Sequence, residues 1–307
     1  MKRFSKITTT RLARICGVSQ GTVDRALHGR GEIAEKTRER ILSVAREYDY
    51  IPTVHGSENG NSMLIGVVLY DLYNEFFSKL AMSLVEAAKE IGYSIIFQFS
   101  DKDLATERSA LEYFDFIGVD GIVLFSVGSD SEEYKNYLHS LKKPLVLIGN
   151  PMYGLPFFGV DDEAAMHDLT LRLCADAPRG PVLYFAPILK RDLHEENCQR
   201  RRLSGFVRAM THLARPFRVV TEVEELSDFG AIVCSTDYYA LKALRYLQGE
   251  QDLKIAGFDN ISLLKLLDRR VLTVEYSTDR IARQSIHYLL GNRYSNHIPY
   301  TVLYNGE

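Results

Sequence analysis

A short segment near the N-terminus carries side chains suited to reading the edges of nucleic-acid bases. At helical spacing its polar face would consist of Gln20, Gly21, Asp24 and Arg25. Glutamine forms paired hydrogen bonds with adenine and arginine with guanine, and each good pair contributes about 1–3 kcal/mol of discrimination. Gly21 would allow close approach to a backbone, and Asp24 would accept from a cytosine amine or orient Arg25. The alternative for Arg25 is an ordinary salt bridge on a surface helix.

Hydroxyl and basic side chains around this face suit contacts with phosphate groups. They are Thr8, Ser19, Thr22 and Arg38, with Lys6 nearby. Residues 1–52 contain eleven Lys and Arg against six Asp and Glu, a net charge of +5, so the other 255 residues carry −8. A basic N-terminal part on an acidic remainder indicates that the first part binds double-stranded DNA. The alternative is chance clustering of basic residues on surface helices.

The apolar residues of this region predict the helix-turn-helix that would hold those side chains outward. The first helix would begin at Thr8, and the second would open at Ser19, whose hydroxyl is a suitable cap. Between them, Gly17 can adopt the left-handed conformation that a tight turn needs. A third helix is predicted at 35–49, so residues 1–52 form a small all-α domain. The apolar framework of the first two helices consists of Leu12, Ala13, Ile15, Val18, Val23, Ala26 and Leu27.

Residues 53–62 form a polar linker, and from Met63 to the end of the chain strands alternate with helices. This alternation predicts an α/β body of two doubly wound parallel sheets. The two lobes would comprise about 63–157 with 278–296 and about 158–277 with 297–307. Ligands of such sheets bind at the carboxyl ends of the strands, which here would face a cleft between the lobes. The expected strands are 63–69, 94–100, 121–126, 144–149, 181–186, 217–223, 231–235, 254–258, 272–276 and 298–304.

One connection in the second lobe is too short for an ordinary crossover. The strands predicted at 217–223 and 231–235 are separated by seven residues. A parallel crossover normally needs about a dozen. The lobe therefore lacks a helix at 224–230, or its strands connect differently.

Aromatic and polar side chains near the predicted cleft suit a polyhydroxyl ligand, which needs an apolar plate and a few well-placed polar groups. Phe76 and Phe77 follow the first strand as candidates for the plate; the alternative is that at least one of them packs in the core. The polar candidates are Asn74, Ser126, Arg202, Asp237, Asp259 and Tyr276. Arg202 follows two other arginines in the sequence, so the alternative to a ligand contact is that Arg202 belongs to a basic, solvent-exposed helix face. Asp259 can instead cap the segment that follows it.

Motifs of the common cofactor-binding and metal-dependent enzyme classes are absent. No G-x-G-x-x-G follows a strand, and the sequence has no G-x-x-x-x-G-K-[ST] and no metal-ligand spacing of His or Cys. We therefore expect no cofactor, no metal and no enzymatic activity. Without a long apolar run or a signal-peptide core, and with four scattered cysteines, the protein is expected to be cytoplasmic, with no membrane span. The alternatives are a sugar-binding protein or a sugar-modifying enzyme of doubly wound fold with a regulatory head.

The order of motifs resembles the lactose-repressor (LacI/GalR) family of bacterial transcription regulators over nearly the whole chain. Residues 12–52 follow L-A-x-x-x-G-V-S-x-x-T-V-x-R, then K-T-R, then Y-x-P. Later anchors are Asn74-Glu75-Phe76-Phe77, Val119-Asp120-Gly121-Ile122, Arg202-Leu203-Ser204-Gly205-Phe206 and Gly257-Phe258-Asp259. The match in residues 12–52 is specific. The later motifs are short, and they support the resemblance because they occur in the order typical of the family.

The resemblance implies a repressor that binds double-stranded operator DNA as a homodimer, with a body like a periplasmic sugar-binding protein. It implies a sugar or polyol as the small-molecule effector and favours Arg202 and Asp259 as polar contacts. Effector binding would close the lobes and change operator affinity, as an inducer does. The family's linker normally forms a hinge helix whose leucine enters the minor groove. Residues 53–62 contain no leucine and depart from that pattern.

Overall fold

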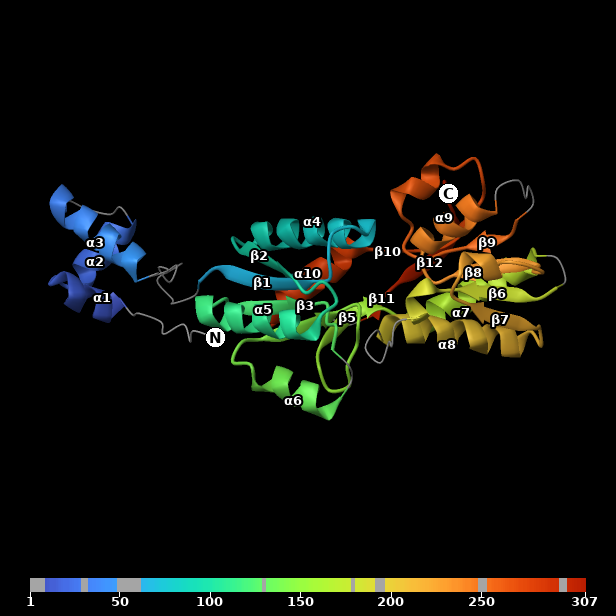
Figure 1. The fold of residues 1–307 in the computed structure, drawn as a ribbon, viewed down its shortest axis with the longest axis horizontal. Coiled ribbons are helices and arrows are strands. Elements are labelled where there is room, and N and C mark those ends of the chain that lie inside the picture. Colours follow the sequence, from blue (N-terminus) through green and yellow to red (C-terminus); the bar gives the residue numbers. More distant parts are fainter. Residues whose placement is uncertain are drawn as a thin grey trace.

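The computed structural model of the chain shows a helical head and two α/β lobes (Figure 1). It describes residues 9–28, 33–48, 62–128, 131–177, 180–190, 197–247, 253–292 and 297–307. No helix within these ranges is long and apolar enough to cross a membrane. The expectations for Thr8 and for nearly all of the linker lie outside the described residues.

The head is the predicted helix-turn-helix with a third helix packed across it. Its elements are α1 (Thr9–Cys16), α2 (Gln20–His28) and α3 (Glu35–Glu47). Gly17 has a φ of +63°, and the amide of Val18 donates to the carbonyl of Ala13 at 3.0 Å, which closes the turn after α1. Ile15 is wrong as a framework residue, because it lies on the exposed side of α1. The buried core of the head consists of Leu12, Ala13, Cys16, Val23, Ala26, Ile41 and Ala45.

The first lobe is an all-parallel sheet with helices on both faces. Its strand order is β11-β5-β4-β3-β1-β2. The strands are β1 (Leu64–Leu69), β2 (Ser94–Phe99), β3 (Gly121–Leu124), β4 (Leu145–Ile148), β5 (Phe157–Val160) and β11 (His297–Ile298). One face packs against α4 (Glu75–Glu90) and α10 (Thr278–Leu289), and the other against α5 (Leu104–Ile117) and α6 (Glu132–Ser140). Apolar runs such as LIGVVL suit strands that are covered on both faces.

The second lobe repeats this architecture, in the order β12-β10-β9-β8-β6-β7. Its strands are β6 (Val182–Phe185), β7 (Phe217–Val220), β8 (Ala231–Cys234), β9 (Ile255–Ala256), β10 (Leu272–Tyr276) and β12 (Tyr300–Tyr304). One face packs against α7 (Asp162–Ala175) and α8 (Asn197–His212), and the other against α9 (Asp237–Tyr246) and the 3-10 helix η3 (Ser262–Leu266). The sheet is not wholly parallel as expected, because the edge strand β12 runs antiparallel to β10.

The chain crosses between the lobes later than the sequence predicted at two of three places. Both β5 and β11 pair in the first sheet, so the crossings lie after Val160 and after Ile298. The third crossing, between β10 and α10, falls where expected. Strands of two to four residues, such as β11 and β5, are too short for alternation of side chains to assign them to a sheet.

The short connection at 224–230 replaces a helix with a single 3-10 turn. This turn, η2 (Val223–Glu225), links β7 to β8, which lie on opposite sides of β6. Leu226 follows the turn and is buried in the core beneath α9. The strands therefore keep the usual order, and the first of the two alternatives, the missing helix, is confirmed.

The closest helix packing in the second lobe depends on Gly205. A Cβ at Gly205 of α8 would lie 2.2 Å from the carbonyl oxygen of Glu163 and 3.1 Å from the amide of His167, both on α7. Backbone atoms cannot move aside as a side chain can, so Gly205→Ala is expected to lower the free energy of unfolding by about 1–3 kcal/mol. Urea unfolding measures this change. Ser204→Ala, at an exposed position of the same helix, should leave stability nearly unchanged, and equal losses in both variants would contradict the explanation.

Candidate functional site

The outward face of α2 carries the residues expected to meet DNA. The amide of Thr22 donates to the hydroxyl oxygen of Ser19 at 3.1 Å, which confirms Ser19 as the cap of the helix. Gln20, Gly21 and Arg25 are exposed, while the apolar residues of α2 turn inward. The guanidinium Nε of Arg25 donates to the carbonyl of Gly21 at 3.2 Å, which holds the side chain along the exposed face.

The other residues expected to contact DNA lie at the start of α2, on α3 or outside the described residues. The hydroxyl groups of Thr22 and Ser19 lie 2.8 Å apart, and Arg38 is exposed on α3. Thr8 and the side chain of Asp24 lie outside the described residues. The described candidates are therefore available at the surface, and their contacts with DNA stay predictions.

A cavity of about 440 Å³ lies between the two lobes and is lined by residues of both. Six of the eight residues predicted for the ligand line it: Asn74, Phe76, Phe77, Arg202, Asp259 and Tyr276. Ser126 and Asp237 are buried behind it and do not belong to the part of its lining that the structure describes. A cavity of this size can hold a small sugar.

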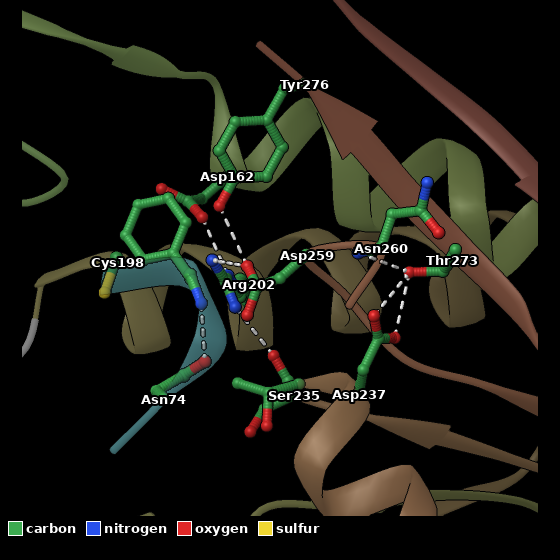
Figure 2. Close-up of polar contacts among 12 residues, drawn as sticks. Asn74, Asp162, Cys198, Arg202, Ser235, Asp237, Asp259, Asn260, Thr273 and Tyr276 are labelled. Atoms are coloured by element: carbon green, nitrogen blue, oxygen red, sulfur yellow. Dashed lines mark hydrogen bonds and ion pairs between the residues drawn. The ribbon is translucent and has the colours of Figure 1, made fainter. Parts of the chain in front are cut away.

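Arg202 is the centre of the polar wall of the cavity (Figure 2). It is 6% exposed, so the alternative of a solvated basic face is wrong. Its Nε donates to Asp162 at 2.7 Å, its Nη1 to the carbonyl of Ser235 at 2.8 Å, and its Nη2 to Asp259 at 3.4 Å. The guanidinium also lies 3.7 Å from the ring centroid of Phe258. These contacts fix the planar group in one orientation.

Asp259 shares its carboxylate between two partners. Its Oδ1 accepts from the hydroxyl of Tyr276 at 2.8 Å and from Arg202, which brings three predicted residues together. Its φ of +104° is rare for a residue with a side chain and marks the sharp turn after β9. Burial raises the pKa of Asp259, and burial raises the pKa of Asp162 to about 6, although Arg202 lowers both. Two buried carboxylates thus face one guanidinium.

Asp237 supports this turn from behind instead of lining the cavity, which corrects its prediction as a ligand contact. Its carboxylate accepts from the amide of Ile261 at 3.0 Å and from the hydroxyl of Thr273 at 2.9 Å. A Cβ at Gly257 would lie 2.2 Å from its Oδ1, so only glycine fits there. Burial, with a smaller contribution from Asp259, raises the pKa of Asp237 to about 7.

Ser126 also lies behind the cavity, in a buried network of the first lobe. Its hydroxyl donates to Glu107 at 2.8 Å, and its carbonyl accepts from Tyr70 at 2.8 Å and from Nδ2 of Asn150 at 2.7 Å. Oδ1 of Asn150 accepts from the amide of Cys198 in the first turn of α8, at 3.0 Å. Asn150, which sequence reasoning missed, therefore connects the first lobe to the helix that carries Arg202.

The aromatic candidates divide between the cavity and the core. Phe77 is 6% exposed and packs against Phe125 and Tyr70, so for this residue the core alternative is confirmed, although it also touches the cavity. Phe76 is half-buried and its ring centroid lies 5.8 Å from that of Tyr276 in the other lobe. Asn74 caps α4 by accepting from the amide of Phe76 at 3.0 Å. Phe76 is therefore the better candidate for the apolar plate.

A second set of contacts joins the lobes at the start of α4. Glu75 accepts from the amide and the hydroxyl of Ser262, at 2.7 and 2.8 Å. Lys79 donates to the carbonyl of Asn260 at 3.3 Å and pairs with Glu75 at 2.6 Å. Because Asn260 adjoins Asp259, these contacts tie the polar wall of the cavity to the first lobe. Sequence reasoning missed them, because nothing local marks residues that meet only after both lobes have folded.

Comparison with known sequences agrees with this geometry in both parts of the chain. The signature described as "Bacterial regulatory proteins, lacI family" matches residues 11–53, and "Periplasmic binding proteins and sugar binding domain of LacI family" matches residues 62–227, more than half of the chain. The chain belongs to the lacI family. As a lacI-family member it is a DNA-binding transcriptional regulator whose body is a ligand-binding domain of the periplasmic-binding type.

Individual relatives and solved structures align over most of the chain. The HTH-type transcriptional regulator TreR of Salmonella typhimurium is 27% identical over 298 residues, covering 93% of each chain. The lac repressor dimer bound to operator and the anti-inducer ONPF shares the fold with a TM-score of 0.65 and 18% identity, covering 93% of this chain and 92% of that one. Cra of Pseudomonas putida in complex with fructose 1-phosphate has a TM-score of 0.67 and 19% identity, covering 78% and 98%. All three of these proteins are named as regulators or repressors.

Proposed function

We propose that this lacI-family protein is a cytosolic homodimeric repressor whose affinity for operator DNA is controlled by a sugar or polyol bound between the lobes. The observation that carries the proposal is the cavity shared by both lobes, with a guanidinium and a carboxylate fixed on one side and an aromatic ring on the other. Polar groups of this kind bind hydroxyls, and the ring packs against the apolar face of a sugar.

The proposed control is a shift between open and closed arrangements of the lobes. A ligand that touches both lobes binds the closed arrangement more tightly and so increases its population. Asn150 and Glu75 contribute hydrogen bonds between the lobes in the arrangement described. By linkage, a ligand that weakens operator binding is itself bound less tightly when operator is present.

On the DNA side, α2 enters the major groove, with Gln20 on adenine and Arg25 on guanine. Ser19, Thr22 and Arg38 then contact phosphates, together with Thr8. In a homodimer the two heads bind half-sites of a palindromic operator. Selection of bound fragments from a pool of random duplexes tests this directly. The proposal requires a palindromic consensus, affinity that falls steeply as salt rises, and release by at least one sugar or polyol.

Arg25→Ala is expected to weaken binding to the selected operator by about 1–3 kcal/mol and to relax the preference for one base pair in each half-site. Fluorescence anisotropy with single-base variants of the operator measures both effects. Arg245→Ala is the control, because Arg245 is an exposed arginine on α9 of the second lobe. An equal loss on every operator variant would show that Arg25 contacts only phosphate, and no loss would remove it from the interface.

A further inference from the structure

Gln199 is a polar residue of the cavity wall whose side-chain oxygen has no hydrogen-bond partner among the described residues. It lies in the first turn of α8, is 7% exposed and lines the cavity. Its side-chain Oε1 is buried and has no hydrogen-bond partner among the described residues. A buried polar atom left without a partner destabilises the protein, so such atoms are usually satisfied by something else that binds there.

The neighbours of Gln199 show why it is the group left for a ligand. Arg202 lies three residues further along the helix, on the same face, and its guanidinium is already bonded to two carboxylates and a backbone carbonyl. An amide offers both donors and an acceptor, and either orientation of the group suits a hydroxyl, which also does both.

The charges around the cavity distinguish an uncharged polyhydroxyl ligand from a phosphorylated one. Its acidic lining residues are Asp71, Asp162 and Asp259, and its basic ones among the described residues are Lys102 and Arg202. Asp162 and Asp259 both pair with Arg202, so its positive charge is already neutralised. A phosphate group placed near this wall would meet an excess of negative charge, and the repulsion disfavours its binding.

We propose that Gln199 determines effector specificity by hydrogen-bonding a hydroxyl of the ligand, and that the effector is an uncharged polyhydroxyl compound instead of a phosphorylated one. This inference rests on the proposed function of the cleft and narrows the class of ligand.

Titration calorimetry of the full-length protein with matched probes tests the charge argument. The pairs are fructose with fructose 1-phosphate, glucose with glucose 6-phosphate and ribose with ribose 5-phosphate, with cellobiose as a larger uncharged probe. The uncharged member that binds is expected to do so at least about tenfold more tightly than its phosphorylated partner, a difference of about 1.4 kcal/mol. A phosphorylated probe that binds more tightly than its partner overturns the inference.

Gln199→Met tests the residue, because methionine keeps the length of the side chain and removes the amide. Affinity for the best uncharged probe is expected to fall about tenfold or more. The melting temperature without ligand should not fall, because the replaced amide has an unpaired oxygen there, and the affinity for operator should stay unchanged. Gln199→Asn, which withdraws the amide from the ligand, provides a second variant and should also lose affinity. Arg200→Met is the control, because Arg200 is the next residue of α8, is exposed and is not part of the described lining.

The outcomes separate this inference from the proposed function. If the unaltered protein binds an uncharged probe and Gln199→Met binds it equally well, the role of Gln199 is refuted while the proposed function stands. If the unaltered protein binds none of the sugars, the sugar-controlled function fails and this inference fails with it.

Discussion

Replacement of Arg202 by methionine is expected to lower the free energy of unfolding of the body by about 3–5 kcal/mol at pH 7. Asp162 and Asp259 are buried, and Arg202 is the cation that pairs with both of them. Methionine fills much of the same volume but leaves two carboxylates without a counter-ion in a dry environment. Removal of one partner from a buried ion pair is therefore far more damaging than loss of a surface pair.

Chemical unfolding at pH 7 and pH 5 measures the effect. The loss should be smaller at pH 5, because the unpaired carboxylates can then take up protons and become neutral. Arg201→Met is the matched control. Arg201 pairs with Asp161 at 3.1 Å on the half-exposed side of the same helix, and its loss should cost at most about 1 kcal/mol. Equal losses in the two variants would contradict the assignment of a buried three-residue cluster.

The same variant should lose its response to the effector. At temperatures where it stays folded, we expect no ligand-induced change in operator affinity, while the affinity itself is retained because α2 is untouched. The melting curve must accompany the binding curve, since Arg202 both holds the wall of the cavity together and lines it. A normal response to ligand in folded Arg202→Met would remove this residue from the site.

The head was predictable from the sequence because local patterns determine it. The left-handed glycine at Gly17, the cap at Ser19 and the helical spacing of apolar residues all lie within thirty residues of each other, and each acts on its immediate neighbours. Most helices and strands of the body were also predictable, because the periodicity of apolar residues that specifies each of them is local. The crossings at Val160 and Ile298 were misplaced because the strands there are short.

The cavity was predictable in part, since topology places strand ends together but leaves the direction of each side chain open. Arg202 and Asp259 point into the cleft, whereas Ser126 and Asp237, which lie just after β3 and β8, turn back into their lobes. Gln199 was missed although one signal was present: it lies three residues before Arg202 on a predicted helix and so shares its face. Asn150 had no such signal, because its role depends on a partner in the other lobe.

Asp237 should make the stability of the second lobe depend on pH, and Asp237→Asn should weaken that dependence. Its pKa is about 7 in the folded protein, raised by burial and then by Asp259 from an ordinary value of 3.8. A group whose folded pKa is raised favours folding most at low pH, and that contribution disappears as pH rises from about 4 towards 7. For a single proton the slope is about 1.4 kcal/mol per pH unit.

Asparagine has nearly the shape of the protonated carboxyl group. Its oxygen can accept from the amide of Ile261, its nitrogen can donate to the hydroxyl of Thr273, and it does not titrate. Unfolding free energies from pH 5 to pH 7 should therefore fall less steeply in Asp237→Asn than in the unaltered protein. Asp162 and Asp259 retain their own dependence, so some slope should remain. Asp268→Asn, at an exposed position of the same lobe, should preserve the full slope. Parallel slopes in all three proteins would mean that Asp237 stays ionised when buried, with its charge fully balanced by the amide and hydroxyl donors around it.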